Sequence, residues 1–346
     1  MKKKLSICLI VLLSLVLVYG FADAKVTGRC DNCHTMHNSQ NGSPQAYDDS
    51  GTLTTTPQGH LAKASCLGCH GVGGVVVGGA PNIFAGVATD MTAGGTFNTT
   101  IATAKSKRHD ITDVFAGGDD SYASGTVPNG TPGAAAGTLG KDMTALTLKC
   151  AGATGCHGRH DAALTTSDAG IRGFHHGTYT GYRYLQTKTG TSIIGTGSAT
   201  WEKVASGPGS AAQHNVYSSD SSAGISKYCA ECHGMFHSDA NTKSGTTWVR
   251  HPTDTLLTGL TGGTTNIDIT SDTAFQNTPV GFDPITTQTT TSTTGYDKTT
   301  AKVICLSCHR AHGSAQDDIL RFAYADQTAG QGAVTLGCKN CHVAQR

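Results

Sequence analysis

Paired cysteines followed at once by a histidine recur along this chain, and their spacing constrains what it can fold into. Five segments have the pattern C-x-x-C-H, and a sixth has the same ends with a longer interior. This pattern is typical of covalent c-type haem attachment, in which two thiols hold one porphyrin and the adjacent histidine ligates its iron. The five regular sites are Cys30/Cys33/His34, Cys66/Cys69/His70, Cys229/Cys232/His233, Cys305/Cys308/His309 and Cys338/Cys341/His342.

The remaining site, third along the chain, is Cys150/Cys156/His157. It is stretched, because the five residues from Ala151 to Gly155 separate its cysteines. Two glycines in this insert could let the backbone bulge outward while both sulfurs still reach one macrocycle. We therefore expect haem attachment here too, and six covalently attached haems c in all.

A zinc site or a redox dithiol is the alternative explanation of a C-x-x-C pair. Neither gives a reason for a histidine directly after the second cysteine at six places. Of the 13 cysteines, all but Cys8 belong to the six sites, which argues against structural disulfides.

Residues 1–24 have the features of a secretory signal peptide. Lys2 to Lys4 precede an apolar run from Leu5 to Val18, and Ala22-Asp23-Ala24 supplies small residues for cleavage. The run is about 14 residues, shorter than the ~20 that span a bilayer, so an uncleaved anchor is the weaker alternative. Residues 25–346 would then be exported without a membrane span, as c-type haem attachment requires, and Cys8 would leave with the leader.

The composition predicts a chain that cannot build an ordinary apolar core. Glycine accounts for 45 of 346 residues, and only 37% of residues are hydrophobic. Such a chain buries too little apolar surface to offset its ordering entropy unless the porphyrins supply the missing core. The near-neutral formal charge of +1 makes nucleic acid an improbable partner.

The expected fold class is mostly coil with short α-helices and few small strands, in one haem-cored domain over residues 25–346. We expect helical pieces at Ile225 to His233, Lys302 to His309 and Asp317 to Ala325, and a long Thr-rich surface loop at about residues 256–300. O-glycosylation of this loop is an open alternative.

Histidines outside the motifs are candidates for the second axial position of each iron. Six of the 16 histidines belong to motifs, which leaves ten for six irons and favours bis-histidine ligation. A histidine just past a motif cannot reach the far face of its own haem, so it would serve a neighbouring haem. The candidates are His37, His109, His237, His251 and His312, followed by His160, His175 and His176, whereas His60 and His214 rank below them.

Bis-histidine irons have both axial positions filled, so they carry electrons rather than transform substrates. The enzyme alternative, a multihaem nitrite, hydroxylamine or sulfur-oxyanion reductase, needs one iron with an open distal position and nearby acid/base groups. The histidine surplus argues against it. We predict an electron carrier that is not an enzyme.

Several segments outside the bare motifs make this chain similar to a known family. The chain resembles the OmcS-type hexahaem outer-surface cytochromes, which polymerise into extracellular conductive filaments. The resemblance is carried by C-D-N-C-H-T-M-H-N-S from Cys30, M-T-A-G-G-T-F from Met91, R-H-D-I from Arg108, Y-C-A-E-C-H from Tyr228, R-H-P from Arg250, C-L-S-C-H-R-A-H from Cys305 and C-K-N-C-H from Cys338.

In that family the histidine three residues after the first motif ligates the fifth haem of the adjacent subunit. The resemblance implies that His37 of one copy completes the iron held by His309 of the next. Such a head-to-tail contact between unlike surfaces propagates as an open filament unless the rotation closes it into a ring.

The sequence thus leaves three functions in order of preference. The first is a polymerised extracellular or outer-surface conduit that exchanges electrons with redox partner cytochromes and passes them to minerals, electrodes or partner cells. The second is a monomeric periplasmic or surface shuttle, and the third is the reductase. Haem potentials, the donor and the terminal acceptor cannot be read from the sequence, since potentials depend on burial and hydrogen bonds around each iron.

Overall fold

Irregular backbone dominates the protein, and its regular elements are short. The computed structural model describes residues 29–71, 80–85, 91–115, 148–176, 179, 181–197, 215–233, 253–257, 278–285, 300–327 and 337–338. Within them the α-helices are α2 (Cys30–Cys33), α3 (Cys66–His70), α4 (Ser167–Gly170) and α5 (Ile225–Cys229). The strands are β1 (Ser39–Gln40), β2 (Ser43–Pro44), β3 (Ala46–Tyr47), β4 (Leu53–Thr54), β5 (Lys149–Ala151), β6 (Gly155–His157), β7 (Gly195–Thr196), β8 (Val216–Ser218), β9 (Gly281–Phe282) and β10 (Ala301–Lys302). The predicted fold class is confirmed.

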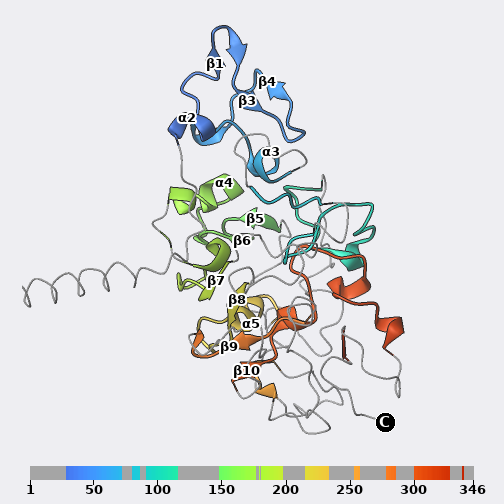
Figure 1. The fold of residues 1–346 in the computed structure, drawn as a ribbon. Coiled ribbons are helices and arrows are strands. Elements are labelled where there is room, and N and C mark those ends of the chain that lie inside the picture. The colour runs from blue at the N-terminus through green and yellow to red at the C-terminus, as the bar shows by residue number, and fades with distance from the viewer. Residues whose placement is uncertain are drawn as a thin grey trace, which may run out of the picture.

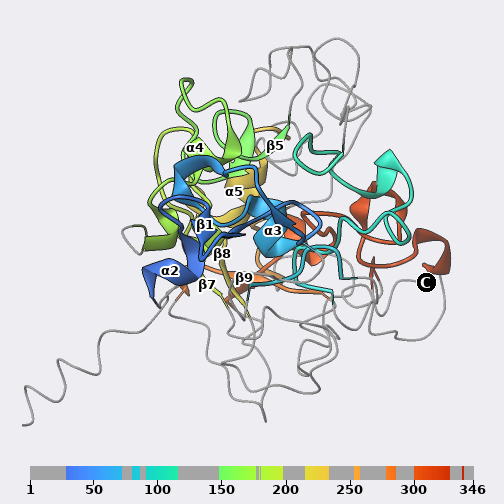
Figure 2. The ribbon, with the colours of Figure 1, turned by 90° about the horizontal axis from the view of Figure 1, so that it is seen from above.

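The elements follow one another along the molecule roughly in chain order (Figure 1). The N-terminal segment with α2, β1 to β4 and α3 forms one end, α4, β5 and β6 lie in the middle, and β8 to β10 with α5 lie beyond them. Residues 91–115 break this order, because they run beside residues 305–320 in both views (Figures 1 and 2) and hydrogen-bond to them.

Pairing between the named strands is local except in one sheet. That sheet has the order β10-β9-β8-β7; β8 and β9 are parallel, and the two outer pairs are antiparallel. The strands β1·β2 and β3·β4 form antiparallel pairs, whereas β5·β6 is a parallel pair.

Two small apolar clusters are present among the described residues. One surrounds Tyr217 and Ile304, and the other surrounds Phe97 and Ile111. The members of the first are Tyr182, Leu185, Ile193, Tyr217, Ile225, Ile304 and Leu306. Neither cluster is large enough to organise a chain of this length, so the framework also depends on turns around the cysteine motifs and on backbone hydrogen bonds between distant segments.

A turn of unusual conformation recurs three times and reveals an internal repeat that the sequence analysis missed. In each turn two successive residues have positive φ: His60 and Leu61, Arg183 and Tyr184, and Asp318 and Ile319. The turns pair with His34, His157 and His309 through the bridges His34–Ala62, His157–Leu185 and His309–Leu320. The histidines of the first, third and fifth motifs are therefore held by the same kind of turn. Residues other than glycine are strained at positive φ. The recurrence of such residues at equivalent places therefore indicates a structural requirement.

The predicted helices are only partly present. The helix expected over Ile225 to His233 ends at Cys229, so Cys232 lies in a turn beyond it. The segment expected from Lys302 to His309 begins in β10 and has a 3-10 turn only over Cys305–Ser307, and the third breaks into 3-10 turns at Asp317–Ile319 and Tyr324–Asp326. In the second segment, pairing of Lys302 with Gly281 and Leu256 overrode the local pattern. The leader and most of the Thr-rich loop lie outside the described residues.

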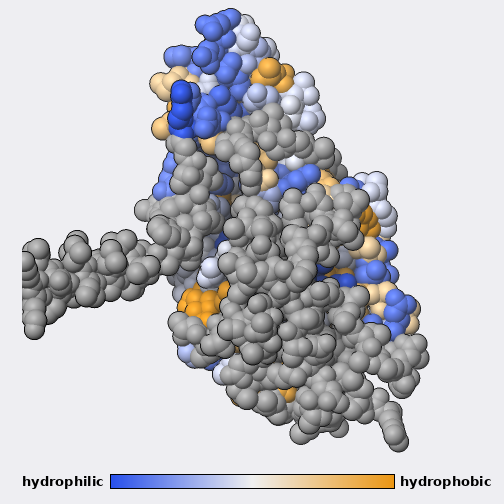
Figure 3. All heavy atoms as spheres, viewed as in Figure 1, coloured by the Kyte–Doolittle hydropathy of each residue, from blue (hydrophilic) through white to orange (hydrophobic). Residues whose placement is uncertain are grey.

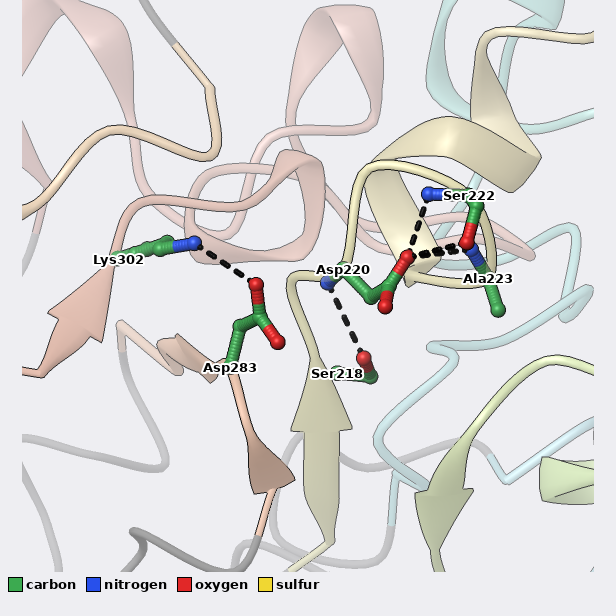
Figure 4. Close-up of polar contacts among 6 residues, drawn as sticks. All are labelled: Ser218, Asp220, Ser222, Ala223, Asp283 and Lys302. Carbon is green, nitrogen blue, oxygen red and sulfur yellow. Dashed lines mark hydrogen bonds and ion pairs between the residues drawn. The ribbon is translucent and has the colours of Figure 1, made fainter.

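A carboxylate turn begins the helix that carries the fourth motif. The Asp220 side chain accepts hydrogen bonds from the Ser222 amide at 2.5 Å, the Ser222 hydroxyl at 2.6 Å and the Ala223 amide at 3.0 Å (Figure 4). The Ser222 hydroxyl lowers the pKa of Asp220 most, and the amides add to this effect. Nearby, Lys302 of β10 forms an ion pair with Asp283 at 3.3 Å.

Replacing Asp220 with Asn should lower the free energy of unfolding near neutral pH by about 0.5 kcal/mol, a small effect because solvent screens an accessible carboxylate. Because the folded-state pKa is lowered, this contribution is complete above the ordinary carboxyl pKa and is lost as the pH falls through the lowered value. Urea unfolding of both proteins from neutral to acid pH checks this, and a difference that stays constant over the range would contradict it.

Candidate haem-binding sites

Three motif histidines each face a histidine from elsewhere in the chain. An iron with two axial imidazoles separates their ring centres by two metal–nitrogen bonds of about 2 Å and two ring radii, on the order of 6 Å in all. The observed ring-centre separations are 5.9 Å for His34 and His176, 6.2 Å for His233 and His109, and 6.3 Å for His157 and His312. Each pair leaves the space that one iron needs.

Backbone carbonyls orient four histidine rings, of three motifs and of His109, through Nδ1. The Nδ1–carbonyl distances are 2.8 Å from His157 to Arg183, 2.8 Å from His309 to Asp318, 3.3 Å from His70 to Pro81 and 2.7 Å from His109 to Ala311. An Nδ1–H that donates to a carbonyl leaves the Nε2 lone pair for a metal. Two of the accepting carbonyls, those of Arg183 and Asp318, belong to the recurring positive-φ turns.

Burial keeps the candidate ligands neutral, which ligation requires. It lowers the pKa of His233 to about 3 and that of His312 to about 3. It also lowers the pKa of His175 to about 4, and the neighbouring His70 is the next largest cause. His175 is therefore within electrostatic range of His70, the second motif histidine.

Contacts on both sides fix the His312 ring. Phe97 stacks on it with ring centres 4.8 Å apart, and a Cβ added to Gly94 would approach its Nδ1 to 3.0 Å. The backbone amide of His312 donates to the Gly94 carbonyl at 2.6 Å, and the amide of His109 donates to the His312 carbonyl at 3.0 Å. The contact between residues 91–115 and 305–320 thus places two histidines at once.

Cysteines of successive motifs lie near one another. Burial raises the pKa of Cys69 to about 11 and that of Cys66 to about 11, with added electrostatic effects of Cys33 on Cys69 and of Asp113 on Cys66. The Cys229 thiol hydrogen-bonds that of Cys305, which raises the pKa of Cys229. The electrostatic neighbours are Cys33 and Cys69, Cys66 and Cys150, Cys156 and Cys229, and Cys229 and Cys305. Since these cysteines would hold the porphyrins by thioether bonds, neighbouring cysteines would place consecutive haems close to one another.

The second cysteine of the fourth motif, Cys232, was expected on a helix and lies instead in the turn that follows α5. This correction leaves the motif closed, because the amides of Cys232 and His233 both donate to the Cys229 carbonyl, at 3.2 and 2.9 Å. The Cys232 side chain is partly exposed. Burial raises the pKa of Tyr228 well above its ordinary value, and the electrostatic effects of Cys156 and then Cys232 raise it further. Cys232 therefore stays beside Cys229, as attachment of both thiols to one porphyrin requires.

Other sequence candidates lie apart from these pairs. His37 is exposed. His60, which ranked low, forms an ion pair with Asp168 at 2.8 Å. His160 contacts the Gly152 carbonyl through Nδ1 at 3.0 Å and lies 6.4 Å from the Tyr228 ring centre. Cys341, His214, His237, His251 and His342 lie outside the described residues.

The donor set fits c-type haem. Among the described residues no group of three or more His, Cys, Asp or Glu side chains could hold a metal ion. Instead, cysteine pairs accompany histidine pairs spaced for one iron. The thiols would hold the porphyrin by adding across its vinyl groups, with the thiol hydrogen passing to the other vinyl carbon, and the histidines would hold the iron. The bound group supplies an iron that changes oxidation state by one electron.

Comparison with known proteins supports this assignment. Residues 299–346 match the family model described as a doubled CXXCH motif. The chain is 28% identical over 394 aligned residues to the C-type cytochrome OmcS of Geobacter sulfurreducens, an alignment that covers 94% of this chain and 85% of that protein.

A solved structure has a similar fold. A cryo-EM structure of OmcS nanowires from Geobacter sulfurreducens matches with a TM-score of 0.51 and 21% identity over 92% of this chain and 88% of that chain. A structure of the OmcS filament from the same organism matches with a TM-score of 0.45 and 20% identity over 91% of each chain. The C-x-x-C-H motifs, the doubled-motif family model and the similarity to OmcS together support covalently bound haem c as the cofactor.

Among the described residues no helix is both long and apolar enough to cross a membrane.

Proposed function

We propose that the protein conducts electrons outside the cell through six bis-histidine c-type haems and polymerises into a filament. The observation that carries this proposal is the three histidine pairs at the spacing of two axial imidazoles. Iron with both axial positions filled resists small ligands and changes oxidation state with little movement. The protein is therefore a carrier and not an enzyme.

The axial assignments follow from the neighbours of each motif histidine. The intrachain pairs are His34 with His176, His70 with His175, His157 with His312, and His233 with His109. His309 takes His37 of the next copy. The partner of His342 comes from His237 or His251, and His160 is the remaining candidate.

Electrons pass between the first five haems in chain order. Cysteines of successive motifs are neighbours from the first site to the fifth, through the stretched third site. The fifth haem then meets the N-terminal end of the next copy, so the path continues from one protomer to another.

The link between copies has a counterpart within the chain. His312 lies three residues after His309 but pairs with His157 of a different motif. His37 lies at the same offset from His34, and it is exposed. It is thus available for a haem that its own chain does not carry. The name of the OmcS nanowire structure describes a filament, which supports the same assembly here.

The surface around His37 suits contact with a second copy. Met36 is 73% exposed, Leu61 53% and Leu53 51%, large values for apolar side chains. In Figure 3 the N-terminal end is mostly hydrophilic, with single hydrophobic residues between the polar ones. A mixed surface of this kind fits an interface with an apolar centre and a polar rim.

Export by removal of residues 1–24 would deliver residues 25–346, as one haem-cored unit, to the extracellular space or the outer surface. The redox partners would be other cytochromes, and minerals or electrodes are the fitting acceptors for an exposed chain of haems.

Removing one distal histidine should change the spin state of one iron. The variants His176→Ala, His109→Ala and His312→Ala should each keep six haems by mass. One iron in six should become high-spin in electron paramagnetic resonance, because it keeps only its motif histidine. His60→Asn is the control, since Asn tolerates positive φ and His60 pairs with Asp168. Wholly low-spin spectra from all three variants would sink the axial assignments.

A further inference from the structure

The stretched motif departs from the regular ones in its secondary structure. In regular sites a helical turn joins the first cysteine to the histidine: the amides of His34, His233 and His309 donate to the carbonyls of Cys30, Cys229 and Cys305 at 2.8, 2.9 and 3.1 Å. In the stretched site the five-residue insert replaces this turn with the parallel strands β5 and β6. The cysteines therefore have to be brought together in another way.

Strand register brings them together. Lys149 pairs with Gly155 and Ala151 pairs with His157, so Cys150 and Cys156 lie opposite one another between these two pairs. Neighbouring strands are about 4.8 Å apart, and residues in register on parallel strands direct their side chains to the same face. Gly152 makes the return possible: its φ is +90°, and an added Cβ would lie 2.6 Å from the Leu164 carbonyl oxygen.

Asp113 holds the first strand from outside the motif. Its Oδ2 accepts the Cys150 amide at 2.7 Å and the Ser167 hydroxyl at 2.6 Å. The Ser167 hydroxyl oxygen in turn accepts the Ala151 amide at 3.0 Å. One carboxylate thus fastens two successive residues of β5, directly at the first cysteine.

Tyr228 holds the second strand, and its contact replaces a backbone contact of the regular sites. In the first and fifth motifs the carbonyl of the second cysteine accepts a backbone amide, from Lys63 to Cys33 at 2.7 Å and from Arg321 to Cys308 at 2.8 Å. At the equivalent carbonyl of Cys156 the donor is the Tyr228 hydroxyl. Tyr228 directly precedes Cys229, so the same side chain joins the third site to the fourth.

We propose that Asp113 and Tyr228 are positioning residues that close the stretched motif, so that Cys150 and Cys156 face one porphyrin side by side. The inference rests on the proposed function, because it takes the stretched motif to be a haem site. Each thiol would add across one vinyl double bond, forming a carbon–sulfur bond and passing its hydrogen to the other vinyl carbon, with no external oxidant. Both additions need the two sulfurs at a fixed separation, which the two side chains maintain.

Mass spectrometry of the exported holoprotein tests this inference. In Asp113→Ala/Tyr228→Phe the main species should carry five haems, and alkylation should label both Cys150 and Cys156 and no other motif cysteine of the twelve. The single variants should show a smaller loss, and Asp113→Asn should restore attachment because its amide oxygen can still accept both hydrogen bonds. Asp161→Ala and Tyr324→Phe are the controls, since both side chains are exposed.

Each result decides the matter. Six haems with no labelled cysteine in the double variant would overturn the inference. Loss spread over several sites would also overturn it, because the two residues would then serve the whole fold. If Cys150 and Cys156 were unmodified in the unaltered protein, the stretched site would hold no haem, and the proposed function itself would have to be reduced to five haems. Five haems with the label confined to this site support the inference.

Discussion

Apoprotein made without haem attachment is expected to show no cooperative unfolding transition. Ordinary domains have unfolding free energies of about 5–15 kcal/mol, and for this chain without haem we expect a value near zero. The described apolar clusters are small, and burying neutral histidines such as His233 and His312 leaves their ring nitrogens without an iron to bind. Circular dichroism during thermal unfolding and the rate of limited proteolysis measure the effect.

The matched control is the holoprotein under the same conditions, which should unfold in a sharp transition and resist protease. A chain with its twelve motif cysteines replaced by alanine removes any effect of free thiols. If that chain kept a cooperative transition and native-like protection, the haems would not be the core, and the framework described above would have to stand on its polypeptide contacts alone.

Replacing His37 with alanine is expected to abolish filaments while leaving all six haems attached. The side chain is exposed, and it occupies the same offset from its motif as His312, which pairs with a different motif. Without it the iron held by His309 loses its second ligand, so one iron in six should become high-spin. Electron microscopy of shed material and electron paramagnetic resonance of the purified protein measure the two effects.

His60→Asn is a suitable control because it alters another exposed histidine of the same N-terminal segment. Filaments should persist in this variant. Filaments of normal length from His37→Ala would show that the interface needs no shared iron. A normal protein that stays monomeric at high concentration would favour the shuttle function instead.

Attachment sites could be predicted from the sequence, whereas most of the ligand pairing could not. A regular motif places two thiols and a histidine within one helical turn, so Cys30 to His34 is recognisable without any other part of the chain. The histidine surplus also predicted second ligands. It could not rank them: His176 stood behind His237 and His251 in the sequence analysis, yet its ring faces His34. The positive-φ turns were missed because His60, Arg183 and Asp318 share no residue type that signals such a turn.

The stretched motif shows the same division. Its two glycines suggested that the insert could bulge outward, and Gly152 has positive φ. That the insert would form parallel strands held by Asp113 and Tyr228 depends on residues 37 positions before Cys150 and 72 after Cys156. No local pattern links them.

By itself the sequence determined how many haem sites there are and where they lie, because thioether attachment depends on neighbouring residues. The tertiary structure alone decided which histidine rings face each other. His109 and His312 take their places because residues 91–115 hydrogen-bond to residues 305–320, as in the 3.0 Å bond from the Thr96 amide to the Gly313 carbonyl. Contacts between segments about two hundred residues apart are set by the folded chain as a whole.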